Sequence, residues 1–454
     1  MLRSVDPATG EIIAEHGEMP PGDVMAAVDR AHDAFLRWRR TTFRERHKHV
    51  MAAARTLRER VDVLARLMAM EMGKPVREGR AEVEKCAWVC EHYAESAERY
   101  LAAEQIGTDA SRSYVVYRPL GVILAVMPWN FPFWQVFRFA APALMAGNSV
   151  VLKHASNVQG CARAIEEVFR ETGIPESIFT NLPVGSAGVR QVIEHPLVRA
   201  VTLTGSGPAG SEVAAAAGRS LKKCVLELGG SDPLVVLEDA DLDLAAERGV
   251  TSRLINTGQS CIAAKRFIVV NAVHDRFVDL VVERMAAVSP GDPLDPDTII
   301  GPLARHDLRD DLHRQVTESV DAGADILLGG EIPRGKGAFY PPTVLTGVTP
   351  GMPAFDEELF GPVAAVVWAE DEEDALHLAN ATSFGLGAAV FTRDTERGER
   401  IAVEVFEAGC CFVNDLVRSD PRLPFGGVKA SGFGRELGPH GIREFVNAKT
   451  VWVR

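Results

Sequence analysis

The sequence lacks any uninterrupted apolar run of about 18 residues, the length that a membrane-spanning helix requires. Its longest apolar stretch, residues 131–146, is broken by prolines, Gln135 and Arg138. The first ten residues are polar and end in the turn sequence Asp6-Pro7-Ala8-Thr9-Gly10, unlike the apolar core of a secretory signal. We therefore expect no contact with a membrane and a cytoplasmic location.

The sequence also lacks an excess of positive charge, with 49 Lys and Arg against 62 Asp and Glu. The formal net charge is −13, and the basic stretch over residues 37–49 is short, helical in pattern and interrupted by Glu45. A nucleic-acid partner needs a compensating basic surface, which this composition does not offer. We expect no nucleic-acid partner.

Cysteines are few and irregularly spaced. The chain has seven, an odd number without framework spacing, which fits a reducing compartment better than a disulfide-stabilised secreted protein. Cys86, Cys90 and His92 lie in a helical pattern with no second pair of ligands, so we interpret them as structural and predict no metal site.

The chain is long enough for two or three domains. It has 454 residues, of which 46% are hydrophobic and 24% charged, as in soluble globular proteins. The first hundred residues are largely helical in pattern, with a break at Gly73-Lys74-Pro75. From there on, apolar runs typical of buried strands alternate with helical patterns, at residues 113–118, 122–126, 149–153, 179–184, 200–204, 234–237, 266–270, 326–328, 363–368, 388–392 and 411–414. This alternation predicts α/β domains with parallel sheets, joined near Gly229-Gly230.

One glycine motif points to a dinucleotide. Gly205-Ser206-Gly207-Pro208-Ala209-Gly210 matches G-x-G-x-x-G after a predicted strand and before a helix-compatible segment. In that context backbone N–H groups and a helix start can face a phosphate. The fingerprint usually opens the first βαβ unit, and two or three strands precede it here. The acidic residue some twenty positions later, Glu227, precedes Leu-Gly-Gly and suits a turn better than a strand end, so a packing role for these glycines stays open.

A thiol and a carboxylate suggest covalent chemistry. Cys261 ends Asn256-Thr257-Gly258-Gln259-Ser260-Cys261, between a helical pattern and a predicted strand. Glu227 lies 34 positions earlier on a glycine-rich turn that would let its side chain move. A nucleophile with a mobile base fits this pair, although most cysteines are small buried side chains.

Seven motifs, in order along the chain, together resemble the aldehyde dehydrogenase superfamily. They are Pro128-Trp129-Asn130-Phe131-Pro132, Lys153 after its strand, Thr204-Gly205-Ser206 with Gly210, Glu227-Leu228-Gly229-Gly230, Gly258-Gln259-Ser260-Cys261, Glu358-Leu359-Phe360-Gly361-Pro362, and Pro424-Phe425-Gly426-Gly427 with Ser431-Gly432 and Gly434-Arg435-Glu436. Each motif alone is weak, whereas their combination and order are specific.

The resemblance implies an α/β fold of two doubly wound parallel-sheet domains and a small β oligomerisation element. The Rossmann-like, dinucleotide-binding domain would comprise residues 1–110 and 119–229, and the catalytic domain residues 230–428. Residues 111–118 and 429–454 would form the oligomerisation element of a homodimer or homotetramer.

The resemblance also implies a mechanism. Cys261 would attack the aldehyde carbon, and the Asn130 side-chain amide and the Cys261 backbone N–H would stabilise the oxyanion. A hydride would leave to NAD(P)+, and Glu227 would activate the water that hydrolyses the thioester. Since a free thiol is largely protonated at neutral pH, the site must lower its pKa or pass the proton to a base.

Further positions match cofactor residues of that family. Lys153 would hold the adenosine ribose, Glu358 the nicotinamide ribose and Ser206 would approach the pyrophosphate. The complete predicted cofactor set is Trp129, Lys153, Ser156, Gly205, Ser206, Gly210, Glu358 and Phe360. Ser156 stands where strict NAD enzymes often carry glutamate, so NADP is permitted and NAD is not excluded.

The sequence is most similar to short bacterial succinate-semialdehyde dehydrogenases, as in Leu152-Lys153-His154-Ala155 and Ala304-Arg305-His306-Asp307-Leu308-Arg309. Such a substrate needs a cation for its distal carboxylate, and the resemblance assigns Arg138 to it. Trp134, Arg418 and Ser419 complete the predicted substrate set. A second arginine of some relatives is replaced by Ile255.

Three alternatives stay open at this stage. The substrate could be glutarate semialdehyde or a neutral aliphatic aldehyde. The chain could instead be a nucleotide-independent thiol esterase that uses Cys261 and Glu227. It could also be a non-catalytic, nucleotide-binding subunit.

Overall fold

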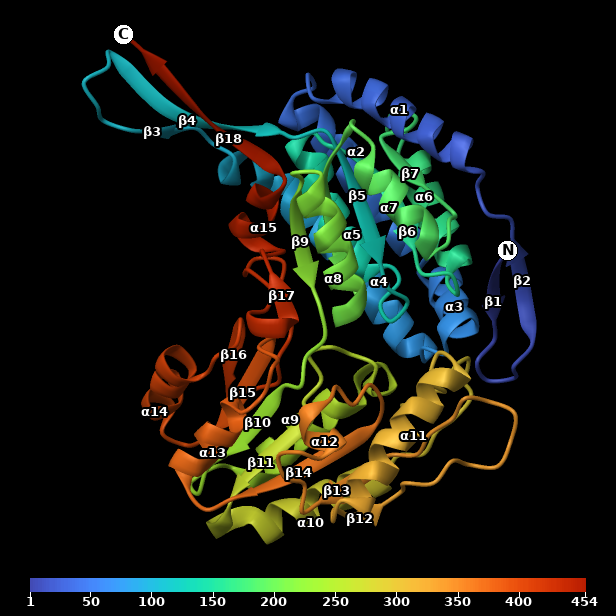
Figure 1. The fold of residues 1–454 in the computed structure, drawn as a ribbon, viewed down its shortest axis with the longest axis vertical. Coiled ribbons are helices and arrows are strands. Elements are labelled where there is room, and N and C mark those ends of the chain that lie inside the picture. Colours follow the sequence, from blue (N-terminus) through green and yellow to red (C-terminus); the bar gives the residue numbers. More distant parts are fainter.

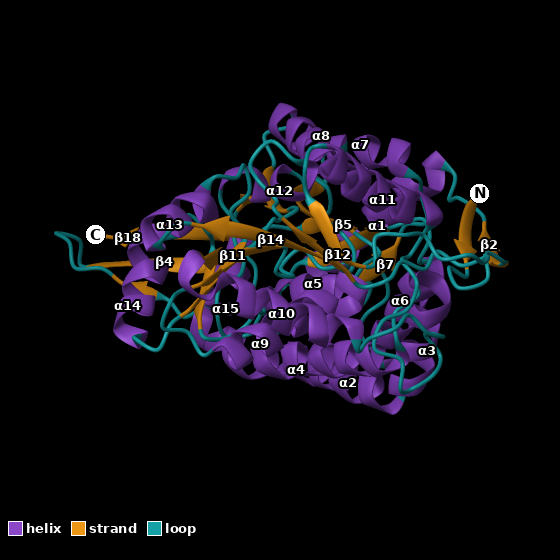
Figure 2. Ribbon diagram, turned by 90° about the horizontal axis from the view of Figure 1, so that it is seen from below, coloured by secondary structure: helices purple, strands orange, loops and turns teal.

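The computed structural model describes all 454 residues, which form two large sheets, each covered by helices on both faces (Figures 1 and 2). The six-stranded sheet has the order β17-β9-β8-β5-β6-β7. Its strands are β17 (Gly432–Phe433), β9 (Lys223–Glu227), β8 (Val198–Thr204), β5 (Val122–Met127), β6 (Ser149–His154) and β7 (Phe179–Asn181). All neighbours are parallel except β17, which runs antiparallel to β9.

Two apolar layers cover this sheet. One layer contains α1 (Pro21–Trp38), α7 (Ser186–Glu194) and α8 (Gly207–Arg219). The opposite, larger layer contains α2 (Phe43–Glu59), α3 (Val61–Met72), α4 (Val76–Tyr100), α5 (Trp134–Ala146), α6 (Gln159–Glu171) and α15 (Gly438–Glu444). Because β5 has a helix layer on each side, its residues are almost all buried, as its continuous apolar sequence predicts.

The seven-stranded sheet has the order β12-β13-β14-β11-β10-β15-β16 and is parallel except for the edge strand β12. Its strands are β10 (Pro233–Val236), β11 (Arg266–Val270), β12 (Asp325–Leu328), β13 (Thr343–Thr346), β14 (Val363–Ala369), β15 (Gly387–Phe391) and β16 (Cys410–Val413). On one face lie α9 (Leu242–Leu254) and α10 (His274–Ala286), and on the other α11 (His306–Asp321), α12 (Pro353–Asp356) and α13 (Glu372–Asn380). The short α14 (Thr395–Arg400) follows β15.

Two small sheets complete the fold. The antiparallel β18-β4-β3 sheet extends from the body as an arm, with the C-terminus at its tip (Figure 1). It consists of β3 (Glu104–Gln105), β4 (Arg112–Pro119) and β18 (Val446–Val453). At the other side, β1 (Leu2–Val5) pairs with β2 (Ile12–His16). No helix of the structure combines the length and the apolarity that crossing a membrane would need.

The predicted fold class is confirmed, and the main departures are local. The helical reading of the N-terminal hundred residues overlooked β1 and β2, and the strand predicted at 179–184 ends at Asn181, ahead of Pro183. The expectation that Glu227 lies on a turn was wrong, because Glu227 is the last residue of β9 and pairs with Thr204. The chain crosses from one large sheet to the other directly after it, between Glu227 and Pro233.

Candidate active site

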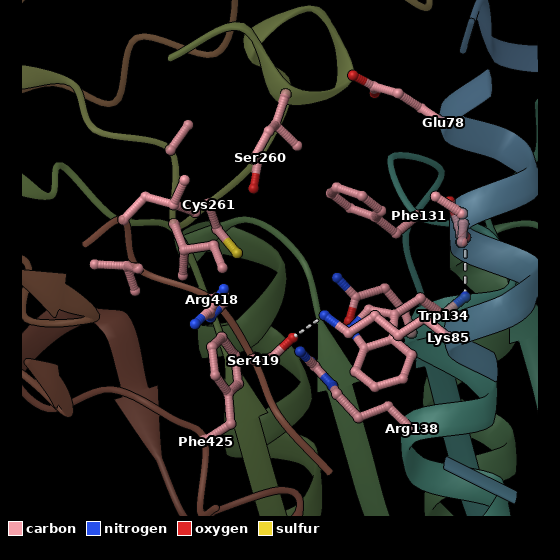
Figure 3. Close-up of a pocket in the computed structure, with 18 residues that line it drawn as sticks. Glu78, Lys85, Phe131, Trp134, Arg138, Ser260, Cys261, Arg418, Ser419 and Phe425 are labelled. Carbon is pink, nitrogen blue, oxygen red and sulfur yellow. Dashed lines mark hydrogen bonds between the residues drawn. The ribbon is translucent and has the colours of Figure 1, made fainter. Parts of the chain in front are cut away.

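The candidate site is a cavity of about 290 Å³ between the two large sheets. Cys261 contributes to its wall from the segment before β11, and Figure 3 shows the sulfur directed into the cavity. Phe131, just before α5, Trp134, its first residue, and Phe425 form apolar parts of the wall. A concave, mainly apolar cavity with a few polar groups is the usual form of a small-molecule site.

The segment before Cys261 has an unusual backbone. Asn256, Thr257 and Gly258 follow one another with φ angles of 54°, 57° and 77° in η1 (Ile255–Gly258). A β-carbon on Gly258 would lie 2.2 Å from the carbonyl oxygen of Gly361. Only glycine therefore lets this segment approach the Glu358–Pro362 segment so closely.

Hydrogen bonds fix this conformation. The Asn256 side-chain Nδ2 donates to the carbonyl oxygens of Asn130, at 2.7 Å, and of Gln259, at 3.1 Å. The Asn130 Nδ2 donates to the same Gln259 oxygen, at 3.1 Å. The buried Lys265 ammonium donates to the carbonyl oxygens of Ser260, Cys261 and Ala263, at 3.0, 2.8 and 3.1 Å. Asn130 is thus bonded to the segment before Cys261, and Lys265 separately holds the Cys261 carbonyl.

The Cys261 thiol is half-buried and faces the cavity. Burial, helped by the nearby Glu358 carboxylate, raises its pKa to about 12. The thiol is therefore protonated at neutral pH in this conformation, and its attack on a carbonyl requires a group that accepts the proton.

Glu227 is 2% exposed, and neither of its carboxylate oxygens has a hydrogen-bond partner. Its Oε1 lies so close to Gly426 that a β-carbon there would be 2.6 Å away. Burial raises the Glu227 pKa well above its ordinary value, against the opposing charge of Arg138. Unpaired buried carboxylates are costly, and such groups are frequent at functional sites.

Arg138 extends from α5 to the cavity wall, but a neighbouring carboxylate already balances its positive charge. Its Nε forms an ion pair with the Glu436 carboxylate, and both side chains are buried. Its Nη2 donates to Thr204 Oγ1 at 3.3 Å, and the guanidinium carbon lies 4.8 Å from the centre of the Phe425 ring.

Three more side chains bring polar groups to the same wall. Arg418 lines the cavity, with a side chain that is 64% exposed and forms an ion pair with Asp415 at 3.0 Å. Ser419 Oγ accepts a hydrogen bond from Lys85 Nζ at 2.8 Å (Figure 3). The Lys85 ammonium also lies 4.4 Å from the centre of the Trp134 ring.

The predicted adenosine side of the cofactor site is a separate cavity of about 490 Å³. Lys153, at the end of β6, lines it beside the apolar side chains of Val126, Ala209 and Val213. Burial lowers the Lys153 pKa, and no acidic side chain forms an ion pair with it. An unpaired ammonium beside an apolar slot suits a ribose or phosphate next to an adenine ring.

The residues predicted to approach the pyrophosphate lie between a strand and a helix, as the G-x-G-x-x-G motif requires. Ser206 is the residue before the first turn of α8, directly after β8, with Gly205 on the same turn and Gly210 buried in the helix. The free N–H groups of this helix start can bind phosphate oxygens. Ser156 lies exposed on the turn after β6.

The predicted nicotinamide side is closest to Cys261. The Glu358 Oε1 accepts a hydrogen bond from the Gly230 N–H at 3.0 Å and lies 3.9 Å from Lys265 Nζ. Burial raises the Glu358 pKa. The rings of Trp129 and Phe360 pack edge to face, with centroids 5.7 Å apart.

The sequence interpretation missed four residues of this site. Asn256 and Lys265 shape the Cys261 segment, Glu436 pairs with Arg138, and Lys85 brings an unassigned ammonium to the cavity. Asn256 and Glu436 lie within motifs that the interpretation quoted, yet the order of residues in a motif does not show their side-chain contacts. Cys86 and Cys90 lie on α4 and are buried in the core, in agreement with a structural role.

Comparisons with known proteins agree with this geometry. The profile of the aldehyde dehydrogenase family matches residues 1–451. A succinate semialdehyde dehydrogenase (NAD(P)+) from Escherichia coli is 48% identical over 449 residues, covering 99% of this chain and 97% of its own. A succinate-semialdehyde dehydrogenase (NADP(+)) from Mycobacterium tuberculosis is 50% identical over 455 residues, covering 100% of this chain and 99% of its own.

A solved structure is similar over the same length. The succinic semialdehyde dehydrogenase from Streptococcus pyogenes, crystallised in complex with NADP+ as the cofactor, superposes with a TM-score of 0.97 at 37% sequence identity. The match covers 100% of both chains.

Proposed function

Because the chain belongs to the aldehyde dehydrogenase family, we propose that it oxidises succinate semialdehyde to succinate with NADP+ or NAD+ as the electron acceptor. The observation that carries this proposal is the cavity that joins the Cys261 thiol to the cationic side chains of Lys85 and Arg138. An aldehyde bound to the thiol would direct a distal carboxylate toward these cations. The similarity to relatives named for this substrate supports the same conclusion.

The first step is the addition of the Cys261 sulfur to the aldehyde carbon. The S–C bond forms, the carbonyl electron pair moves onto oxygen, and the thiol proton passes to a base. The Asn130 amide keeps one N–H beyond its bond to Gln259, and with the Cys261 backbone N–H it would bind the oxyanion. Loss of one such donor typically raises the barrier by about 3–4 kcal/mol.

NAD(P)+, when bound, supplies the acceptor for the hydride of the thiohemiacetal carbon. The two sets of residues described above fit the two halves of such a dinucleotide. Lys153 would bind the adenosine ribose or a 2′-phosphate, and Ser206 with the start of α8 would bind the pyrophosphate. Glu358 would orient the nicotinamide ribose, with Trp129 and Phe360 packed beside it.

Hydrolysis of the thioester on Cys261 regenerates the thiol. We assign Glu227 as the base that takes a proton from the attacking water. Its carboxylate points toward Gly426 in this structure, so it acts after turning toward the thioester. The two glycines after it, Gly229 and Gly230, leave the turn free of side chains that would oppose this motion.

We propose a cytoplasmic homodimer or homotetramer as the working form. All seven cysteines are free thiols, which supports a reducing compartment. The arm of β3, β4 and β18 offers exposed strand edges that a second copy could pair with.

The Cys261→Ala variant tests the mechanism. Formation of reduced nicotinamide from succinate semialdehyde should fall by about 10⁴-fold or more, the usual loss when a covalent nucleophile is removed. Nucleotide binding, followed by calorimetry, should persist because Lys153 and Ser206 lie elsewhere. Measurable turnover in the variant would refute the nucleophile assignment.

In the wild type, specificity constants for succinate semialdehyde, glutarate semialdehyde and butanal test the substrate.

A further inference from the structure

Lys85 is a cation without an assigned role in the cavity that contains Cys261. It lies on α4, three residues after Glu82, so both side chains face α5. The Glu82 carboxylate accepts hydrogen bonds from the backbone N–H groups of Phe133 and Trp134, both at 2.9 Å. This contact fixes α4 against the start of α5, and it places the Lys85 ammonium in the cavity wall (Figure 3).

No carboxylate pairs with this ammonium. Its hydrogen-bond partner is the neutral hydroxyl of Ser419, and its other close contact is the Trp134 ring. The nearest acidic side chains are already engaged, since Glu82 forms an ion pair with Lys74 and Asp420 with Arg422. A half-buried ammonium without a counterion is costly and therefore attracts an anion.

The other two cations of the wall are less available. Arg138 is paired with the buried Glu436 carboxylate, so the pair carries little net charge. Arg418 is largely exposed to water and is paired with Asp415. Ile255, where some relatives carry an arginine, is apolar and lines the same cavity. The Glu78 carboxylate also lines the cavity, where it accepts a hydrogen bond from the Asn256 N–H and forms no ion pair with a cation of the wall. Lys85 is therefore the cation of the wall that has no ion-pair partner.

We propose that the Lys85 ammonium binds the distal carboxylate of the substrate, together with the Ser419 hydroxyl, and thereby sets the preference for carboxylated aldehydes. This inference rests on the proposed function. Ser419 would accept from Lys85 while donating its own proton to the carboxylate, so both contacts can form at once. The Trp134 ring would cover one side of the ion pair and keep water from it.

The charge of Lys85 should depend on pH in the catalytic range. Burial and the Arg138 charge lower the pKa of Lys85 to about 8, while Cys86, Asp420 and Glu82 act in the opposite direction. Arg418, Cys261 and Glu78 also face the cavity, and burial raises the pKa of Glu78 to about 7. The ammonium is present below about pH 8 and is lost above it, so binding of a carboxylate should weaken as the pH rises through that value.

The test compares succinate semialdehyde with its neutral analogue, methyl 4-oxobutanoate, through the ratio of their kcat/KM values. This ratio cancels both the ionisation of Cys261 and the fraction of folded enzyme. Lys85→Met should lower the ratio about 10- to 100-fold, mainly through KM for the acid, since hydrogen bonds to charged groups contribute that much. Lys85→Arg should retain most of the preference. Lys48→Met, at an exposed lysine of the neighbouring helix α2, should leave the ratio as in the wild type.

The wild type provides a second measurement that needs no variant. Its ratio should be constant below about pH 8 and fall above it, whereas in Lys85→Arg it should stay constant over the same range. A preference that survives Lys85→Met but disappears in Arg138→Met would assign the carboxylate to Arg138 and overturn the inference. A wild-type ratio near one would instead refute the proposed substrate, and the role of Lys85 with it.

Discussion

At the residue scale, burial opposes the charged forms of both groups assigned to covalent catalysis. Burial raises the pKa of Cys261 to about 12 and that of Glu227 well above its ordinary value. The sequence interpretation required either a lowered thiol pKa or a base that takes the thiol proton. Because the pKa of Cys261 is raised, a base is required. A neutral thiol also resists oxidation until the substrate arrives.

The Glu227→Gln variant should separate the two halves of the reaction. Thiohemiacetal formation and oxidation should still occur, giving a burst of about one reduced nicotinamide per active site. Steady-state turnover should then fall by about 10²- to 10⁴-fold, the contribution typical of a general base. Rapid mixing would record the burst, and mass spectrometry would identify the acylated Cys261.

The glutamine also removes a buried ionisable group. We therefore expect Glu227→Gln to unfold at the temperature of the wild type or slightly above it. Steady-state turnover within twofold of the wild type would show that another group activates the water.

The site residues were recognisable from their motifs, but their contacts were not. The motifs name Cys261, Glu227 and Asn130, and the structure joins Asn130 by hydrogen bonds to Asn256 and Gln259, in the segment that ends at Cys261. The roles of these residues stay predictions. Lys85 carried no signal, because a lysine in an amphipathic helix resembles any other solvated lysine until its tertiary neighbours are known.

At the element scale, the decisive feature is the backbone segment that ends at Cys261. Three successive residues with positive φ turn the chain between α9 and β11, and the Asn256 side chain holds that turn to Asn130. Strained backbone of this kind persists only where surrounding contacts stabilise it. The segment therefore positions the thiol at the expense of local stability.

Replacing Gly258 by alanine should disrupt this element. The new β-carbon would lie 2.2 Å from the Gly361 oxygen, and the φ of 77° opposes any side chain. We expect a lower melting temperature and a kcat/KM reduced by about 100-fold, the loss typical of a displacement of about 1 Å at a reacting group.

Gly218→Ala on α8 is a suitable control for that variant. A β-carbon there meets no atom within 4 Å, so the control should keep both activity and stability. Wild-type activity in Gly258→Ala would show that the close approach to Gly361 does not position Cys261.

Most elements were predicted from periodicity alone, and those missed share a physical cause. β5, β6, β8 and β11 are apolar runs buried on both faces, and each was predicted to within about two residues. β13 has threonine at both ends, β9 begins and ends with charged residues, and β1 with β2 forms a small ribbon. Such short strands are defined by their partners rather than by their own composition.

At the scale of the whole molecule, the arm is the feature that the single chain leaves unexplained. β4 and β18 pair over eight residues and project into solvent, with Ile106, Trp452 and Val453 exposed (Figure 1). Small isolated sheets are marginally stable in water. Pairing with a second copy would cover the exposed side chains.

Trp452→Asp should therefore weaken self-association. Light scattering after size exclusion should give a multiple of 49.2 kDa for the wild type and a lower mass for the variant at micromolar concentration. Trp368→Asp, at another exposed tryptophan away from the arm, should keep the wild-type mass. A wild-type mass equal to that of one chain would refute the oligomer.

The sequence by itself determined the α/β class, the family and the identity of the motif residues, because periodicity and motif order depend only on the order of residues along the chain. The tertiary structure decided which charges are balanced and which are not. Lys85 and Arg138 are 53 positions apart in sequence but line the same cavity, because α4 packs against α5. The C-terminal segment that packs against both helices brings the Glu436 carboxylate to Arg138, whereas it brings only the Ser419 hydroxyl to Lys85. Electrostatics depends on distance and burial, and neither quantity can be read from residue order.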